Sequence, residues 1–180
     1  MTSLLDTFIA NWDHWGGSWE HWENEISARL ALLRYLREQN RNEILAWQVE
    51  KLPISGLLGA LTDAGISLQH PHRRNLSPDV GMGLTAADAA LADSGSLVLA
   101  PAPGRSWLPA LIPIHHVVLL PTKLLYPDLS SWRQEWRQTR PQDANQALII
   151  SGPSVSDDIE LHKHYGMFGP RRVHVILFDS

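Results

Sequence analysis

The chain has no cysteine among its 180 residues, and this absence excludes several kinds of site. Disulfides, zinc sites with thiolate ligands and iron–sulfur clusters bound by the chain's own cysteines are all ruled out. Long apolar runs are also missing, because the longest one, near residues 117–120, is broken by Pro113 and Pro121. It falls well short of the roughly 20 residues that span a bilayer. The first residues lack a basic segment followed by an apolar one, so we expect no secretory signal and a cytoplasmic protein.

Clustered positive charge is scarce as well. The net charge is −4, and no basic run is longer than Arg73-Arg74 or Arg171-Arg172. Because a nucleic-acid footprint needs a clustered basic face, we expect no nucleic-acid partner. Hydrophobic residues make up 44% of the chain and charged residues 19%, which is typical of a globular protein. We expect one domain over residues 1–180.

Short apolar runs alternate with amphipathic segments along the chain. Residues 21–39 place apolar side chains at helical spacing, and residues 116–120 are apolar on both faces, as in a strand covered on two sides. Further helices are expected at residues 3–14, 53–64, 86–92 and after Asp128, and further strands at residues 18–20, 43–47, 66–69, 96–100, 147–151 and 173–178. This alternation predicts an α/β fold, a three-layer sandwich with a mostly parallel sheet between helices.

The first candidate site follows residues 147–151. Gly152, Pro153 and Ser154 are expected to form a turn that opens a short acidic helix, at the sheet edge where open α/β folds bind ligands. Glycine permits close backbone approach, and exposed amides can bind a ligand oxygen. Asp158 or Glu160 would contact a ligand hydroxyl, amine or metal, or would merely cap the helix. The carboxylates disfavour a phosphate ligand, and the P-loop pattern is absent.

The second candidate site is the turn of Asp93, Ser94 and Gly95. Its carboxylate and hydroxyl groups, with those of Ser96, can bind or polarise a small polar substrate, and the alternative is a plain turn at the end of a helix. We expect this turn and the one near residue 154 to meet at one rim of a single parallel sheet.

No catalytic or metal-binding pattern stands out, so the catalytic residues stay unassigned and no metal site is predicted. His162 and His164 are two residues apart and cannot share a metal from one helix face. His115 and His116 open a strand and face opposite sides, so structural or surface roles are expected. A Ser-His-Asp triad has no Gly-x-Ser-x-Gly turn to support it.

Eight tryptophans are present. Trp132 and Trp136 lie on the apolar face of their expected helix and are interpreted as core. Trp12, Trp15 and Trp19 surround a Gly-Gly pair and are interpreted as core or as a surface for a partner.

Four ordered blocks resemble the LUD domain family, the LutC-like lactate utilisation proteins. Residues 83–99 (Gly-Leu-Thr-Ala-Ala-Asp-Ala-Ala-Leu-Ala-Asp-Ser-Gly-Ser-Leu-Val-Leu) are similar to the family's Gly-x-Thr-x-Ala-Asp and Ala-Glu-Thr-Gly-Thr-Leu-Val-Leu stretch. Residues 113–121 resemble its next strand, and residues 152–160 resemble its Gly-Pro-Ser-x-Thr-Ala-Asp-Ile-Glu. Residues 166–177 are similar to its Gly-Val-His-Gly-Pro-x-x-Leu-His-Val-Ile-Leu.

The resemblance implies a NagB/RpiA/CoA-transferase-like fold and a role beside iron–sulfur partner subunits that oxidise L-lactate to pyruvate. The LutC-like member is the subunit without cluster-binding cysteines, which agrees with this chain. A small hydroxy- or keto-acid, or a larger ligand, is the implied ligand, and the cofactor stays open. Asp93 stands where the family has Glu, Phe168 where it has His, and Asp157 where it has a small residue.

Two rival functions remain open. One is a CoA-transferase-like or nucleotide-dependent ligase activity, with Asp93 as a carboxylate nucleophile that would trap a CoA thioester. The other is a non-catalytic assembly subunit that uses the tryptophan-rich segment at the start of the chain.

Overall fold

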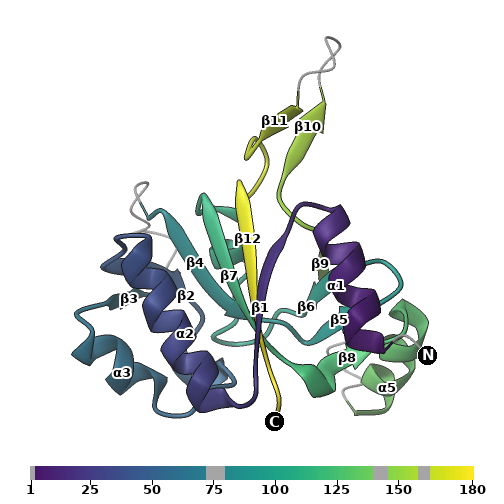
Figure 1. The fold of residues 1–180 in the computed structure, drawn as a ribbon, viewed down its shortest axis with the longest axis horizontal. Helices are drawn as coiled ribbons and strands as arrows, with labels where there is room; N and C mark the ends of the chain where they lie inside the picture. The colour runs from purple at the N-terminus through teal and green to yellow at the C-terminus, as the bar shows by residue number, and fades with distance from the viewer. Residues whose placement is uncertain (1–2, 72–79, 140–145, 158–162) are drawn as a thin grey trace.

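The computed structural model describes residues 3–71, 80–139, 146–157 and 163–180 (Figure 1). The helices are α1 (Leu4–His14), α2 (Glu25–Glu38), α3 (Leu57–Asp63), α4 (Leu108–Leu111) and α5 (Leu129–Thr139), with the 3-10 turns η1 (Val49–Lys51) and η2 (Thr122–Leu124). The strands are β1 (Ser18–Trp22), β2 (Glu43–Ala46), β3 (Ser67–Gln69), β4 (Met82–Ala86), β5 (Ala89–Leu91), β6 (Ser96–Leu99), β7 (His115–Pro121), β8 (Leu125–Tyr126), β9 (Leu148–Ile150), β10 (Val155–Asp157), β11 (Lys163–Tyr165) and β12 (Arg172–Phe178).

The main sheet has six strands in the order β1-β12-β7-β4-β2-β3, and every neighbouring pair is parallel. β7 and β4 are the central pair, and all seven residues of β7 are buried. Helix α2 packs on β1 and β12, while α4 packs on β4 and β7. The predicted α/β fold, with a mostly parallel sheet flanked by helices, is therefore confirmed.

The helices begin where the sequence supplies caps. Ser3 and Asp6 form a reciprocal capping box at the start of α1, and the side chain of Asn24 accepts hydrogen bonds from the first amides of α2. Such caps satisfy amides that have no partner inside the helix. The inner face of α1 carries Phe8 and Trp12, both completely buried, so α1 is fixed to the core by its aromatic side chains.

A second, four-stranded sheet was not expected from the sequence. Its order is β8-β5-β6-β9, and β6 is antiparallel to both of its neighbours. The helix predicted at residues 86–92 is wrong, because β4 ends at Ala86 and β5 covers Ala89–Leu91. All residues of both strands are buried, whereas a surface helix would expose one face.

The predicted acidic helix after Ser154 is also wrong at its start. Residues Val155–Asp157 form β10, which pairs antiparallel with β11. This two-stranded ribbon projects beyond the main sheet (Figure 1). Asp158, Glu160 and His162 lie outside the described residues.

In the described part of the chain, no helix is both long and apolar enough to cross a membrane.

Candidate functional site

The turn of Asp93, Ser94 and Gly95 joins the antiparallel strands β5 and β6. The side chain of Asn11 in α1 donates to the carbonyl oxygens of Ala92 and Asp93, at 2.8 and 3.2 Å. Gly95 has a φ of 60°, and a Cβ there would lie 2.6 Å from the backbone of Asn11. Glycine is therefore required both by conformation and by the close approach of α1. The alternative of a turn at the end of a helix is wrong, because a strand precedes this turn.

The turn of Gly152, Pro153 and Ser154 follows β9 and is tied to the chain entering β12. The amide of Ser154 donates to the carbonyl of Pro170 at 2.9 Å, and the Ser154 hydroxyl accepts from the amide of Phe168 at 3.2 Å. The Ser154 carbonyl accepts from the amide of Gly166 at 2.9 Å. The amide, the carbonyl and the hydroxyl of Ser154 are therefore all hydrogen-bonded within the protein.

The two turns do lie together, at one end of the four-stranded sheet. The hydroxyl oxygens of Ser96 and Ser151 are 2.7 Å apart. Trp15 contacts both turns. Its indole N–H donates to the Ser94 carbonyl at 2.8 Å. Its Cβ lies so close to Gly152 that a Cβ added to Gly152 would be only 2.7 Å away. Pro170 and Trp15 precede β12 and β1, so the turns lie at the amino ends of the parallel strands. The expected position at the carboxyl edge of the parallel sheet is wrong.

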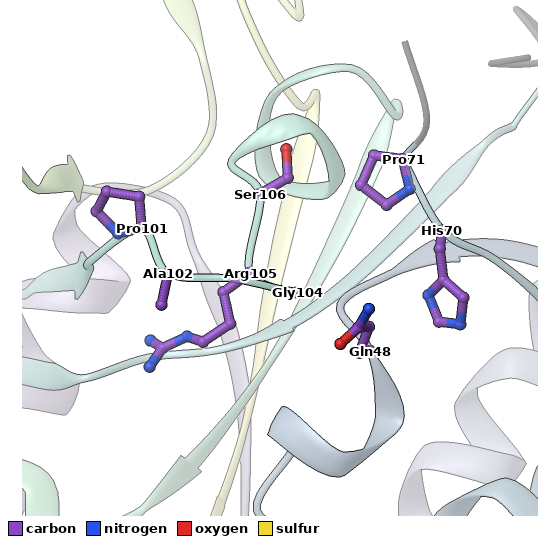
Figure 2. Close-up of a pocket in the computed structure, with 8 residues that line it drawn as sticks. All are labelled: Gln48, His70, Pro71, Pro101, Ala102, Gly104, Arg105 and Ser106. Carbon is purple, nitrogen blue, oxygen red and sulfur yellow. The ribbon is translucent and has the colours of Figure 1, made fainter. Parts of the chain in front are cut away.

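The carboxyl edge of the parallel sheet holds a cavity of about 460 Å³ (Figure 2). Gln48 follows β2, His70 follows β3, and residues 101–106 follow β6. Open α/β folds bind their ligands at this edge, and the volume falls in the range of ordinary ligand pockets. A three-carbon acid would fill part of it.

Arg105 is the charged side chain that lines this cavity. It is ion-paired with Asp88, and the two side chains are only 11% and 7% exposed. The Arg105 Cζ lies 4.3 Å from the ring centroid of Trp47, while Asp88 also accepts from the amide of Ala100 at 2.7 Å. Arg105 Nε is buried and has no hydrogen-bond partner among the described residues. The guanidinium is thus held in one orientation with donor capacity left over, which suits a carboxylate ligand.

The loop over the cavity is fastened to the end of β2. The indole N–H of Trp47 donates to the Ser106 carbonyl at 2.7 Å, and the Gln48 amide donates to the Gly104 carbonyl at 3.0 Å. Gly104 has a φ of 78°, and a Cβ there would lie 2.3 Å from Gln48 Oε1. Packing of this kind keeps polar groups in a fixed geometry, as a binding site needs.

The histidines of β7 and β12 are buried in the main sheet. His116 is completely buried, and its Nε2 lies 2.8 Å from the Thr85 hydroxyl. Burial lowers the pKa of His116 from 6.5 to about 3, so the ring is neutral at physiological pH. His115 and His174 also have lowered pKa values because of burial. Across the described residues, no group of three His, Asp or Glu side chains could hold a metal ion.

The sequence interpretation did not select Gln48, His70, Arg105 or Ser106 as site residues. A usable signal was present at Arg105, which lies in a loop directly after the buried strand of residues 96–100. Gln48 and Arg105 are far apart in sequence, and they meet because the segment after β2, in the parallel sheet, is hydrogen-bonded to the loop after β6, in the second sheet.

Comparison with known families identifies the class of protein. The model of the LUD domain family matches residues 15–178, so this chain belongs to the LUD domain family.

Two relatives with similar sequences carry the same name. "Lactate utilization protein C" of Exiguobacterium sp. is 36% identical over 115 residues, covering 62% of this chain and 50% of the relative. The protein of the same name from Halalkalibacterium halodurans is 27% identical over 160 residues, covering 83% of this chain and 68% of the relative. The chain thus matches half of the first relative's length and about two thirds of the second's. A DUF162 family protein from Deinococcus radiodurans shares the fold, with a TM-score of 0.65 at 14% identity, over 97% of this chain and 96% of that one.

Proposed function

We propose that this LUD-domain chain acts in lactate utilisation and binds a small hydroxy- or keto-acid in the cavity beside Arg105. Two similar proteins carry the name "Lactate utilization protein C", which supports the role. The observation that carries the ligand class is the Arg105 guanidinium, almost buried, fixed by Asp88 and Trp47, and lining a cavity at the carboxyl edge of the sheet. A guanidinium of this kind recognises a planar carboxylate through paired N–H donors.

The test is a calorimetric titration of L-lactate and of pyruvate into the protein and three variants. Arg105→Lys keeps the charge but loses the fork of donors, and we expect affinity to fall roughly 10- to 100-fold, since hydrogen bonds to charged groups contribute about 1.5–3 kcal/mol. Gln48→Ala should also weaken binding. Ser94 lies in the turn between β5 and β6, away from the cavity, and Ser94→Ala serves as the matched control.

The pattern of loss locates the ligand. Weaker binding in Arg105→Lys and Gln48→Ala, with Ser94→Ala unchanged, supports the cavity. Weaker binding in Ser94→Ala alone would instead favour the site predicted from the sequence, whose ligand role stays a prediction. That site comprises Asp93, Ser94, Gly95, Gly152, Pro153, Ser154, Asp158 and Glu160. No heat with the unmodified protein would contradict the small-acid proposal.

Oxidation of lactate to pyruvate releases two electrons, and the chain has no cysteine to bind an iron–sulfur cluster. We therefore propose that electrons pass to a separate partner subunit that carries such clusters. Co-purification from the native source, followed by iron analysis of the associated proteins, tests this partnership. The cytoplasmic location stays a prediction.

A second candidate function is that of a non-catalytic assembly subunit. The β10–β11 ribbon and the residues after it expose large apolar side chains, with Phe168 79% exposed, Met167 58% and Tyr165 49%. Exposed apolar patches are typical of protein interaction sites. Replacement of Phe168 by Ser should then release co-purifying partners without changing the thermal stability of the isolated chain.

A further inference from the structure

The amino ends of the central strands bring basic side chains together, at the opposite edge from the cavity. His115 begins β7 and is aligned with Met82 of β4 on one side and with Arg172 of β12 on the other. Its amide donates to the carbonyl of Gly81 at 3.1 Å. The starts of three adjacent parallel strands therefore place His115 between Gly81 and Arg172.

Arg41 reaches the same place from the segment between α2 and β2. Its guanidinium lies directly on Gly81, because a Cβ at Gly81 would be 2.6 Å from the Arg41 Cζ. Arg41 is only partly buried, yet its Nε is buried and has no hydrogen-bond partner in the described part of the chain. Glycine at position 81 thus makes room for a guanidinium beside the backbone segment that is hydrogen-bonded to His115.

His115 supplies a second unpartnered nitrogen. The residue is 8% exposed, and its Nδ1 is buried without a partner among residues that the structure describes. Burial lowers the pKa of His115, and the positive charges of Arg172 and Arg41 lower it further. Both guanidinium charges are therefore close enough to act on the same imidazole.

No carboxylate within the described residues forms an ion pair with Arg41 or Arg172. The neighbouring carboxylates of Glu20 and Glu38 are instead paired with Arg34. A buried polar nitrogen without an acceptor costs free energy, most of all on a charged group. The cluster therefore has donors and positive charge but lacks an acceptor.

We propose that Arg41, His115 and Arg172 form a binding site for an oxyanion, the phosphate or carboxylate group of a small molecule. Arg172 is an exposed residue, so a ligand can enter from outside. Arg41 would bind it from the Gly81 side, and neutral His115 would donate from Nδ1. The site is separate from the cavity beside Arg105 and does not depend on the proposed role in lactate utilisation.

Calorimetric titration with inorganic phosphate and with acetate tests the proposal, at an ionic strength held constant with sodium chloride. We expect saturable binding of at least one of the two anions, weakened at least ten-fold in Arg41→Gln and in Arg172→Gln. Arg137→Gln, an exposed arginine on α5, is the matched control and should bind like the unmodified protein. Binding of phosphate alone assigns the site to phosphorylated ligands, and binding of both anions assigns it to oxyanions in general.

Nuclear magnetic resonance of the unmodified protein gives a readout that does not depend on the folding of any variant. The bound anion should shift the ring resonances of His115 and leave those of His116, which is sealed against Thr85, unchanged. Absence of saturable binding overturns the proposal, as does equal weakening in Arg137→Gln or a response at both histidines.

Discussion

The neutral, buried His116 predicts a defined loss of stability in acid. In the unfolded chain this side chain gains a proton near pH 6.5, whereas burial lowers its pKa in the folded protein to about 3. Between these values the unfolded state binds one more proton than the folded state, so the free energy of unfolding falls as the pH falls. At 1.36 kcal/mol for each pKa unit, the loss from pH 7 to pH 4.5 is about 2.5 kcal/mol from this residue alone.

The perturbation is the double substitution His116→Leu with Thr85→Val. Replacing both partners avoids an unpaired buried hydroxyl, since the Thr85 hydroxyl is bonded to His116. Urea unfolding of both proteins at several pH values gives the difference in their free energies of unfolding. His115 and His174 are present in both proteins, so their contributions cancel. If the free energy of unfolding falls equally in both proteins between pH 7 and pH 4.5, the reasoning is refuted.

The remaining predictions concern unfolding measured with urea at neutral pH. Gly83→Ala should destabilise the protein by roughly 3 kcal/mol, because the new Cβ would lie 1.7 Å from a backbone carbonyl oxygen. Gly59→Ala, on α3, meets open space and should stabilise the protein by about 0.5–1 kcal/mol. Equal effects of the two substitutions would contradict this geometry. Asn24→Ala removes the cap of α2 and should cost about 1 kcal/mol; an unchanged midpoint would show that the cap contributes nothing. Asp88→Asn leaves the nearly buried Arg105 without its counter-charge and should lower the free energy of unfolding by roughly 3–5 kcal/mol. A decrease of less than 1 kcal/mol would show that the guanidinium is solvated.

Sequence patterns correctly predicted the helices that have one buried and one exposed face, and the buried central strand. Helices α1 and α5 have one apolar face, and the cap at Asp128 is confirmed, because its carboxylate accepts a hydrogen bond from the Ser131 amide at 2.7 Å. The face of α2 was predicted less well, since Ile26 and Leu30 are 58% and 61% exposed. The run at residues 116–120 was correctly predicted as a strand covered on both sides. The parallel sheet followed from the alternation of such segments.

The errors arose where tertiary contacts override local preference. Residues 86–92 contain five alanines, which favour a helix in isolation, but residues 89–91 instead pair with β6 and β8 in the second sheet. The acidic residues after Ser154 suggested a helix start, yet pairing with Lys163–Tyr165 makes residues Val155–Asp157 a strand. The cavity could not be predicted because its lining comes from the ends of three strands that are distant in sequence.

The LUD match begins at residue 15, one position after α1 ends, yet that helix supplies two aromatic rings to the interior. Phe8 and Trp12 stack with ring centroids 5.8 Å apart and have no exposed surface. Losing one buried aromatic side chain costs about 3–5 kcal/mol, against a typical total stability of about 5–15 kcal/mol. Recombinant protein trimmed to the matched segment would therefore expose the apolar core surface that Phe8 and Trp12 cover. Expression should start before residue 3, so that α1 and its cap are included. The unit recognised by sequence is smaller than the unit that folds.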